Sequence, residues 1–171
     1  MTRYVALLRS VNVGGTGKLP MADLRDICLK QGLRNASTFI ASGNALFDSD
    51  LAEAEIVGKL EAALLSYAGK PIAVLVRSGA EMAAIAAANP FPEIPGNRTL
   101  VLFLPAPPPA DWQDRVSGRF DERLTAIGRE IFIDYGSIGM GKSKLRLPLD
   151  KIGTGRNINS VTKLAALLAI A

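Results

Sequence analysis

At 171 residues, the chain is long enough for one ordinary domain or two small ones, and its 49% apolar and 21% charged residues are typical of a globular protein. It contains no histidine and a single cysteine, which excludes Ser-His-Asp and Cys-His catalytic groups, His-ligated zinc, thiolate metal cages and an internal disulfide. Neither a leader segment nor an apolar run long enough to cross a bilayer is visible, so we expect a cytoplasmic protein that does not bind membranes.

The opening stretch predicts a strand, a glycine-rich loop and the start of a helix. Residues 4–8 are a short apolar strand, and the glycines of the loop after it expose backbone N–H groups. Pro20 suits the first turn of a helix. Proteins commonly bind ligands where a strand runs through such a loop into a helix. The candidate ligand-binding residues here are Arg9, Asn12, Gly14, Gly15 and Lys18.

The rest of the first half follows a regular order. Residues 21–31 have helical spacing with Cys28 on the apolar stripe, and residues 37–47 form a hairpin that turns at Ser42, Gly43 and Asn44. A helix over residues 51–68 ends at Gly69, and a continuous apolar strand follows over residues 71–77. The order strand-helix-strand-strand-helix-strand is that of a ferredoxin-like fold.

The second half repeats much of this order. Ser78 and Glu81 form a capping box for a helix that ends near Asn89. We then expect a strand at 100–104, a short helix at 112–116, a hairpin at 123–135 turning at Gly128-Arg129, and an amphipathic helix at 157–170. The predicted fold is α+β, with two ferredoxin-like halves (1–78 and 79–171) whose antiparallel sheets are backed by helices.

The excess positive charge lies in one segment. Residues 136–163 carry six basic side chains and one acidic one, a net charge of +5, while the other residues together carry −1. Such a concentration suits an anionic partner, although a solvated basic edge would have the same composition.

Two motifs in this segment are typical of phosphate binding. Residues 136–143 (GSIGMGKS) fit the phosphate-loop pattern Gly-x-x-x-x-Gly-Lys-Ser/Thr, but Pro148 would interrupt the long helix that should begin at Lys142. Residues 154–160 lead into the last helix, where Asn157 can cap it and Arg156 could pair with an anion. A capped helix beside a solvated arginine explains the same residues.

Several motifs in order resemble the DUF1697 family of small bacterial proteins. They are VALLRSVNVGGTGKLPMADL, the later SGN, ANPFP, GMGKSKL and RNINSVTKL. The resemblance implies an α+β fold of ferredoxin-like halves but supplies no activity. Its blocks fall on Arg9, Asn12, Gly14, Gly15, Lys18, Ser42, Gly43, Asn44, Lys142, Ser143, Lys144, Arg156, Asn157 and Asn159. Ile158 stands where the family often has an aromatic residue, which weakens any expectation of base stacking at that position.

We therefore expect a protein that binds an anionic ligand, either a nucleotide-like molecule or a nucleic-acid backbone, through its glycine-rich and basic loops. Two alternatives remain open: an enzyme of phosphate-ester or nucleotide chemistry, and a structural or self-associating module. No catalytic residue, cofactor or metal site is assigned from the sequence, and the oligomeric state stays unknown.

Overall fold

The computed structural model describes residues 1–9, 18–40 and 42–170. The chain divides into two compact units, Met1–Met82 with Leu164–Ala171, and Ala83–Lys163. Both boundaries fall inside helices, since α3 (Gly79–Ala87) and α4 (Ile158–Leu168) each contribute residues to both units.

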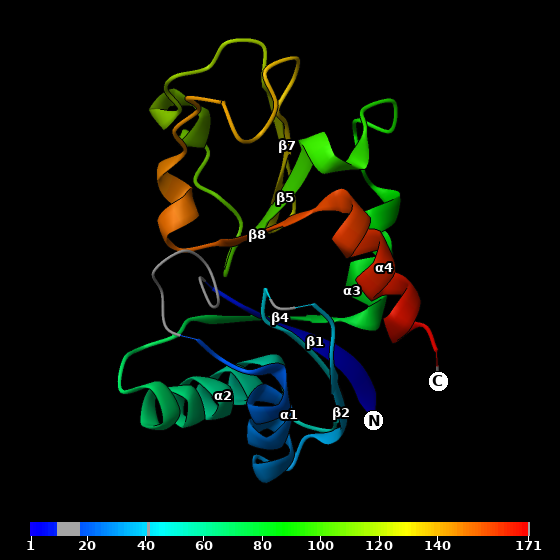
Figure 1. Ribbon diagram of the computed structural model, residues 1–171. Coiled ribbons are helices and arrows are strands. Elements are labelled where there is room, and N and C mark those ends of the chain that lie inside the picture. Colours follow the sequence, from blue (N-terminus) through cyan, green and yellow to red (C-terminus); the bar gives the residue numbers. More distant parts are fainter. Residues whose placement is uncertain (10–17, 41, 171) are drawn as a thin grey trace. The chain divides into compact units, whose positions relative to one another are not determined.

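The first unit has the predicted ferredoxin-like order. Its elements are β1 (Thr2–Leu8), α1 (Met21–Lys30), β2 (Arg34–Thr38), β3 (Asn44–Ser49), α2 (Glu53–Ala68) and β4 (Val74–Ser78). The four strands form one antiparallel sheet in the order β2-β3-β1-β4. Figure 1 shows α1 and α2 on the same face of this sheet.

Alternate residues of the strands build the core beneath those two helices. Ala6 and Leu8 of β1 and Phe47 of β3 are fully buried against the helices. Cys28 of α1 belongs to this core, as its place on the apolar stripe predicts, and burial raises the pKa of its thiol to about 12. Gly69 ends α2 in the left-handed conformation, with φ +72°.

The second unit repeats the strand order of the first. Its strands are β5 (Thr99–Phe103), β6 (Arg123–Ile127), β7 (Glu130–Asp134) and β8 (Thr154–Asn157), arranged antiparallel as β6-β7-β5-β8. The turn between β6 and β7 is at Gly128, φ +59°, as predicted. Strand β8 is absent from the sequence prediction because Thr-Gly-Arg-Asn has no apolar residue to signal a strand.

The expected helix at 112–116 is a single 3₁₀ turn. Three such turns occur in this unit: η1 (Gly96–Arg98), η2 (Trp112–Arg115) and η3 (Pro148–Lys151). Trp112 of η2 and Leu147, just before η3, pack with Leu102, Leu124 and Ile131 of the sheet. One sheet face is therefore covered by 3₁₀ turns and extended chain, where the first unit has two α-helices.

The predicted helix caps are confirmed. The Glu81 backbone N–H donates to Ser78 Oγ (3.1 Å), and the Ser78 N–H donates to Glu81 Oε1 (2.9 Å), which completes the capping box of α3. Asn157 caps α4, because its Oδ1 accepts from the Ser160 N–H at 2.9 Å. None of the helices in the described ranges combines the length and apolarity needed to span a membrane.

Candidate functional site

The loop after β7 carries the residues that match the phosphate-loop pattern. Gly136 and Gly139 have φ +61° and +83°, and the Ser143 N–H donates to the Gly139 carbonyl at 3.1 Å. The chain therefore runs through turns here, and no helix begins at Lys142 within the described residues. The Ser143 hydroxyl donates to the Glu122 carboxylate instead of facing a metal position. Both observations count against a nucleoside-triphosphatase loop, as Pro148 in the sequence does.

Two neighbouring carboxylates hold this loop from the chain segment before β6. Asp121 Oδ2 accepts from the Ser137 hydroxyl (2.7 Å) and backbone N–H (3.1 Å), and these bonds hold the pKa of Asp121 below its usual range. Burial alone would raise the pKa of Glu122, but hydrogen bonds from Ser143 and the Phe120 N–H lower it. Both acids are thus ionised at neutral pH, and each accepts a hydrogen bond from a serine of the loop.

A short antiparallel bridge also joins residues 117–118 to residues 144–146. The Arg146 N–H donates to the Ser117 carbonyl at 2.7 Å, and the Ser117 N–H donates to the Arg146 carbonyl at 3.0 Å. Gly118 lies so close that a Cβ there would be 1.9 Å from the Lys144 carbonyl oxygen. Only glycine fits this approach with φ +72°, so the two segments are in direct backbone contact.

Side chains alternate along residues 144–147 as they do in a strand. Leu145 and Leu147 pack on the core of the second unit, while Lys144 and Arg146 are exposed. Lys142 is also exposed, and none of these three cations forms an ion pair with another residue that the structure describes. We call Lys142, Lys144 and Arg146 the loop cations.

Phe120 belongs to the same region. Its side chain is 73% exposed, and it lies two residues beyond Gly118, which contacts Lys144. The sequence interpretation overlooked Phe120 because it lies outside the basic segment 136–163. Its neighbourhood depends on the long-range contact between residues 117–118 and 144–146, for which the sequence has no periodic signal.

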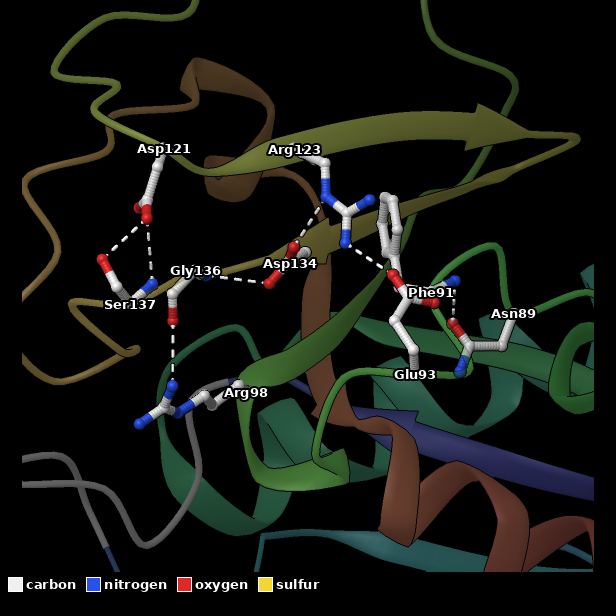
Figure 2. A network of polar contacts seen from close by, with 9 residues as sticks. All are labelled: Asn89, Phe91, Glu93, Arg98, Asp121, Arg123, Asp134, Gly136 and Ser137. Carbon is white, nitrogen blue, oxygen red and sulfur yellow. Dashed lines mark hydrogen bonds and ion pairs between the residues drawn. The ribbon is translucent and has the colours of Figure 1, made fainter.

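The ANPFP motif takes part in the polar network of Figure 2, which also includes Asp121 and Ser137. Arg123 donates from Nε to Asp134 (2.8 Å) and from Nη2 to Glu93 (2.8 Å), and its guanidinium carbon lies 4.6 Å from the centre of the Phe91 ring. Asp134 also accepts from the Gly136 N–H at 2.8 Å. The cation is therefore neutralised within the network, which fixes the start of the basic loop and does not present charge to a ligand.

Arg156 is buried on β8, where the sequence interpretation expected either an anion ligand or a solvated side chain. It is 6% exposed, and its Nη1 donates to Thr154 Oγ1 (2.8 Å) and to the Gly155 carbonyl (3.0 Å). Burial lowers the pKa of the Arg156 guanidinium to about 10. The alternative of a solvated arginine is wrong, because the side chain turns into the protein.

The two neighbours of this arginine are also engaged within the second unit. Asn157 is the helix cap described above. The Asn159 side chain occupies the space beside Gly96, where an added Cβ would lie 1.9 Å from Asn159 Oδ1. Both asparagines at this end of α4 therefore have contacts within the local structure.

The first unit has an arginine at the equivalent strand position. Arg77 is the penultimate residue of β4 as Arg156 is of β8, and they pair with Val5 and Val101 of the central strands. Arg77 is 1% exposed. Its Nη1 donates to the carbonyl of the preceding residue, and Nη1 of Arg156 makes the equivalent hydrogen bond. This recurrence supports an internal repeat of the fold and a structural role for both arginines.

The candidates of the first unit fall into three groups. Asn12, Gly14 and Gly15 lie outside the described residues. Ser42, Gly43 and Asn44 build the hairpin turn, since Asn44 Nδ2 donates to the Phe39 carbonyl (2.8 Å) and to Ser42 Oγ (3.1 Å), and Gly43 has φ +89°. Arg9 and Lys18 stand at the two ends of the first loop. Arg9 is half-buried and its N–H donates to the Ala73 carbonyl at 3.0 Å, while Lys18 is exposed.

Comparisons with known proteins place the fold and leave the activity open. A family model described as "Protein of unknown function (DUF1697)" matches residues 1–132. A solved structure of a conserved bacterial protein from Streptococcus pneumoniae is similar over 98% of both chains, with 25% sequence identity and a TM-score of 0.78. No curated protein matches the chain. Within the described residues, no group of three or more acidic, histidine or cysteine side chains could hold a metal ion.

Proposed function

The chain belongs to the DUF1697 family of proteins of unknown function, and from the loops of its second unit we propose that it binds the backbone of single-stranded nucleic acid. The loop cations, Lys142, Lys144 and Arg146, supply the charge. Binding of this kind neutralises phosphates without reading the sequence of bases.

The observation that carries this proposal is that the acids of the region accept hydrogen bonds from within the protein, whereas its bases are left exposed. Asp121 accepts two hydrogen bonds from Ser137, and Glu122 accepts one from Ser143 and one from the Phe120 N–H. The three loop cations are exposed and unpaired among the residues that the structure describes. Their charge is therefore available to an external anion, while the nearby negative charge is already stabilised from within.

The shape of the region favours an extended ligand over a small one. Lys144 and Arg146 point outward from a strand-like segment, two residues apart and about 6.6 Å along the chain at the usual rise. A row of exposed cations suits a polyanion. A nucleotide-sized molecule would instead favour a concave site.

Phe120 supports the single-stranded form of the proposal. The Phe120 side chain is 73% exposed, so its ring is available to stack on an unpaired base. In double-stranded nucleic acid the bases are already stacked on one another, so Phe120 would add nothing.

Fluorescence anisotropy with a labelled single-stranded oligonucleotide tests the charge requirement. The triple variant Lys142→Gln, Lys144→Gln, Arg146→Gln should weaken binding at least tenfold. A matched control replaces three exposed lysines of the first unit, Lys30→Gln, Lys59→Gln and Lys70→Gln, and changes the net charge equally. If both triple variants lose the same affinity, or the wild-type protein does not bind, the proposal is wrong.

A second pair of variants tests stacking. Phe120→Ala should weaken binding of the single strand by about 1 kcal/mol or more, roughly fivefold, and leave binding of a duplex unchanged. Ile138→Ala, which removes another exposed apolar side chain near the loop cations, should change neither affinity. Equal losses for single strand and duplex would remove Phe120 from the proposal. Tighter binding of mononucleotides than of oligonucleotides would contradict the extended ligand.

A further inference from the structure

A hollow of about 260 Å³ opens between η2 and η3 in the second unit. Its lining residues are Pro109, Trp112, Arg115, Pro148, Leu149, Lys151 and Ile152. None of them belongs to the loop cations, and the hollow is therefore a separate feature from the proposed nucleic-acid surface. At about 30 Å³ per water, it has room for roughly nine water-sized groups.

The walls of the hollow are held by the core and by tight turns. Trp112 is 7% exposed and packs in the same core cluster as Leu147. The backbone N–H of Trp112 donates to the Pro109 carbonyl at 3.1 Å. On the other side, the Ile152 N–H donates to the Leu149 carbonyl at 3.2 Å. Pro148 adds a further fixed backbone angle at the start of η3. The hollow is thus preformed and needs little ordering when a ligand enters.

Its chemistry combines an apolar surface with positive charge. Pro109, Trp112 and Leu149 supply apolar contacts, and Ile152 is 54% exposed although it is fully apolar. When a ligand covers an apolar side chain that is otherwise in water, the free energy of the system falls, so the exposed part of Ile152 favours binding.

Two cations stand among these apolar residues. Lys151 forms no ion pair with any other residue in the described part of the chain. Arg115 pairs with Asp111 at 3.4 Å, but both side chains are more than half exposed, at 66% and 54%, so the pair is weak and can be exchanged for another anion. No acidic side chain lines the hollow among the described residues.

We propose that this hollow binds a small amphipathic carboxylate, with its apolar body against Trp112 and Leu149 and its carboxylate beside Lys151 and Arg115. The volume limits the body to about eight carbon atoms, either an aliphatic chain or one aromatic ring. The apolar lining excludes sugars and other densely polar molecules, and the two cations select an acid over an alcohol or an amine.

The chain provides its own reporter for this site. Trp112 is the only tryptophan in the sequence and lies in the wall of the hollow. We would titrate the full-length protein with octanoate and follow Trp112 fluorescence, with isothermal titration calorimetry as a second measure of binding. Octanol, octylamine and acetate serve as probes that lack the charge, reverse it or lack the apolar body.

The expected result is saturable binding of octanoate and at least tenfold weaker binding of octanol, octylamine and acetate. Lys151→Glu should weaken octanoate at least tenfold and bring octylamine to comparable affinity. Lys70→Glu, an equal charge change on an exposed lysine of the first unit, should leave octanoate binding unchanged. Thermal unfolding of each variant checks that the fold is retained.

Three results would overturn the proposal. Octanol could bind as tightly as octanoate, which would make the hollow a site for apolar molecules without preference for an anion. Lys151→Glu and Lys70→Glu could weaken octanoate equally, which would make the effect one of net charge. Calorimetry and fluorescence could both show no binding of octanoate. Each of these is independent of whether the loop cations bind nucleic acid.

Discussion

Replacing Gly118 by alanine should separate the two chain segments that bring Phe120 near the loop cations. Gly118 and Gly139 both have positive φ, +72° and +83°, but the space around them differs. A Cβ on Gly118 would lie 1.9 Å from the Lys144 carbonyl oxygen and 2.8 Å from its carbonyl carbon. On Gly139 it would meet no heavy atom of the described residues within 4 Å. Gly139→Ala is therefore a matched control that carries the backbone strain without the clash.

The size of the effect follows from these distances. Positive φ at an alanine costs about 1–2 kcal/mol, which both variants share. The clash at Gly118 is with backbone and cannot be relieved by a side-chain rotation. It must break the two hydrogen bonds between Ser117 and Arg146, which contribute about 1–3 kcal/mol together. We expect Gly118→Ala to lower the free energy of unfolding by about 2–5 kcal/mol and Gly139→Ala by about 1–2 kcal/mol.

Urea unfolding followed by circular dichroism measures both free energies. In the fraction that remains folded, Gly118→Ala should also weaken oligonucleotide binding, because Phe120 and Lys144 lose their common anchor. Gly139→Ala should keep the wild-type affinity. Equal stability of the two variants would refute the close approach of Gly118 to Lys144, and full oligonucleotide affinity in Gly118→Ala would refute its role in the site.

Two further predictions concern single titratable groups. The pKa of Asp121 is lowered by its hydrogen bonds from Ser137, so its contribution to stability is complete above the carboxyl range and is lost as pH falls below about 4. Asp121→Asn should therefore flatten the acid side of the thermal-unfolding profile. A steeper acid loss in Asp121→Asn would contradict this assignment. Cys28 is fully buried, and the pKa of its thiol is raised to about 12. A thiol reagent at pH 8 should therefore label the protein only after unfolding in guanidinium. Rapid labelling of the native protein would show that the core around α1 is open.

Local patterns in the sequence determined most of the first unit. Short apolar runs in β1 and β3, helical spacing in α1 and α2, and the glycine at position 69 each depend on neighbours along the chain. The capping box of α3 and the turn at Gly128 were predictable for the same reason. These features together give the ferredoxin-like order without knowledge of long-range contacts.

Features that depend on distant contacts were not predictable. Strand β8 is a strand because β5 supplies its hydrogen-bond partners, and its sequence alone looks like a loop. Arg156 is buried by the sheet it joins, so a residue that resembles an anion ligand in the sequence is part of the interior. Phe120 lies two residues from Gly118, and the contact of Gly118 with Lys144 depends on the long-range bridge between Ser117 and Arg146. Sequence composition located the basic segment, but its structure was needed to separate the exposed cations from the buried one.

The dependence of oligonucleotide affinity on salt tests the central claim most directly. If Lys142, Lys144 and Arg146 each neutralise one phosphate of a single strand, the logarithm of the association constant should fall with the logarithm of salt concentration with a slope of about −2. The triple glutamine variant at these positions should bring that slope close to zero, and the triple variant at Lys30, Lys59 and Lys70 should leave it near −2. A wild-type slope near zero, or one that the loop substitutions leave unchanged, would contradict the account.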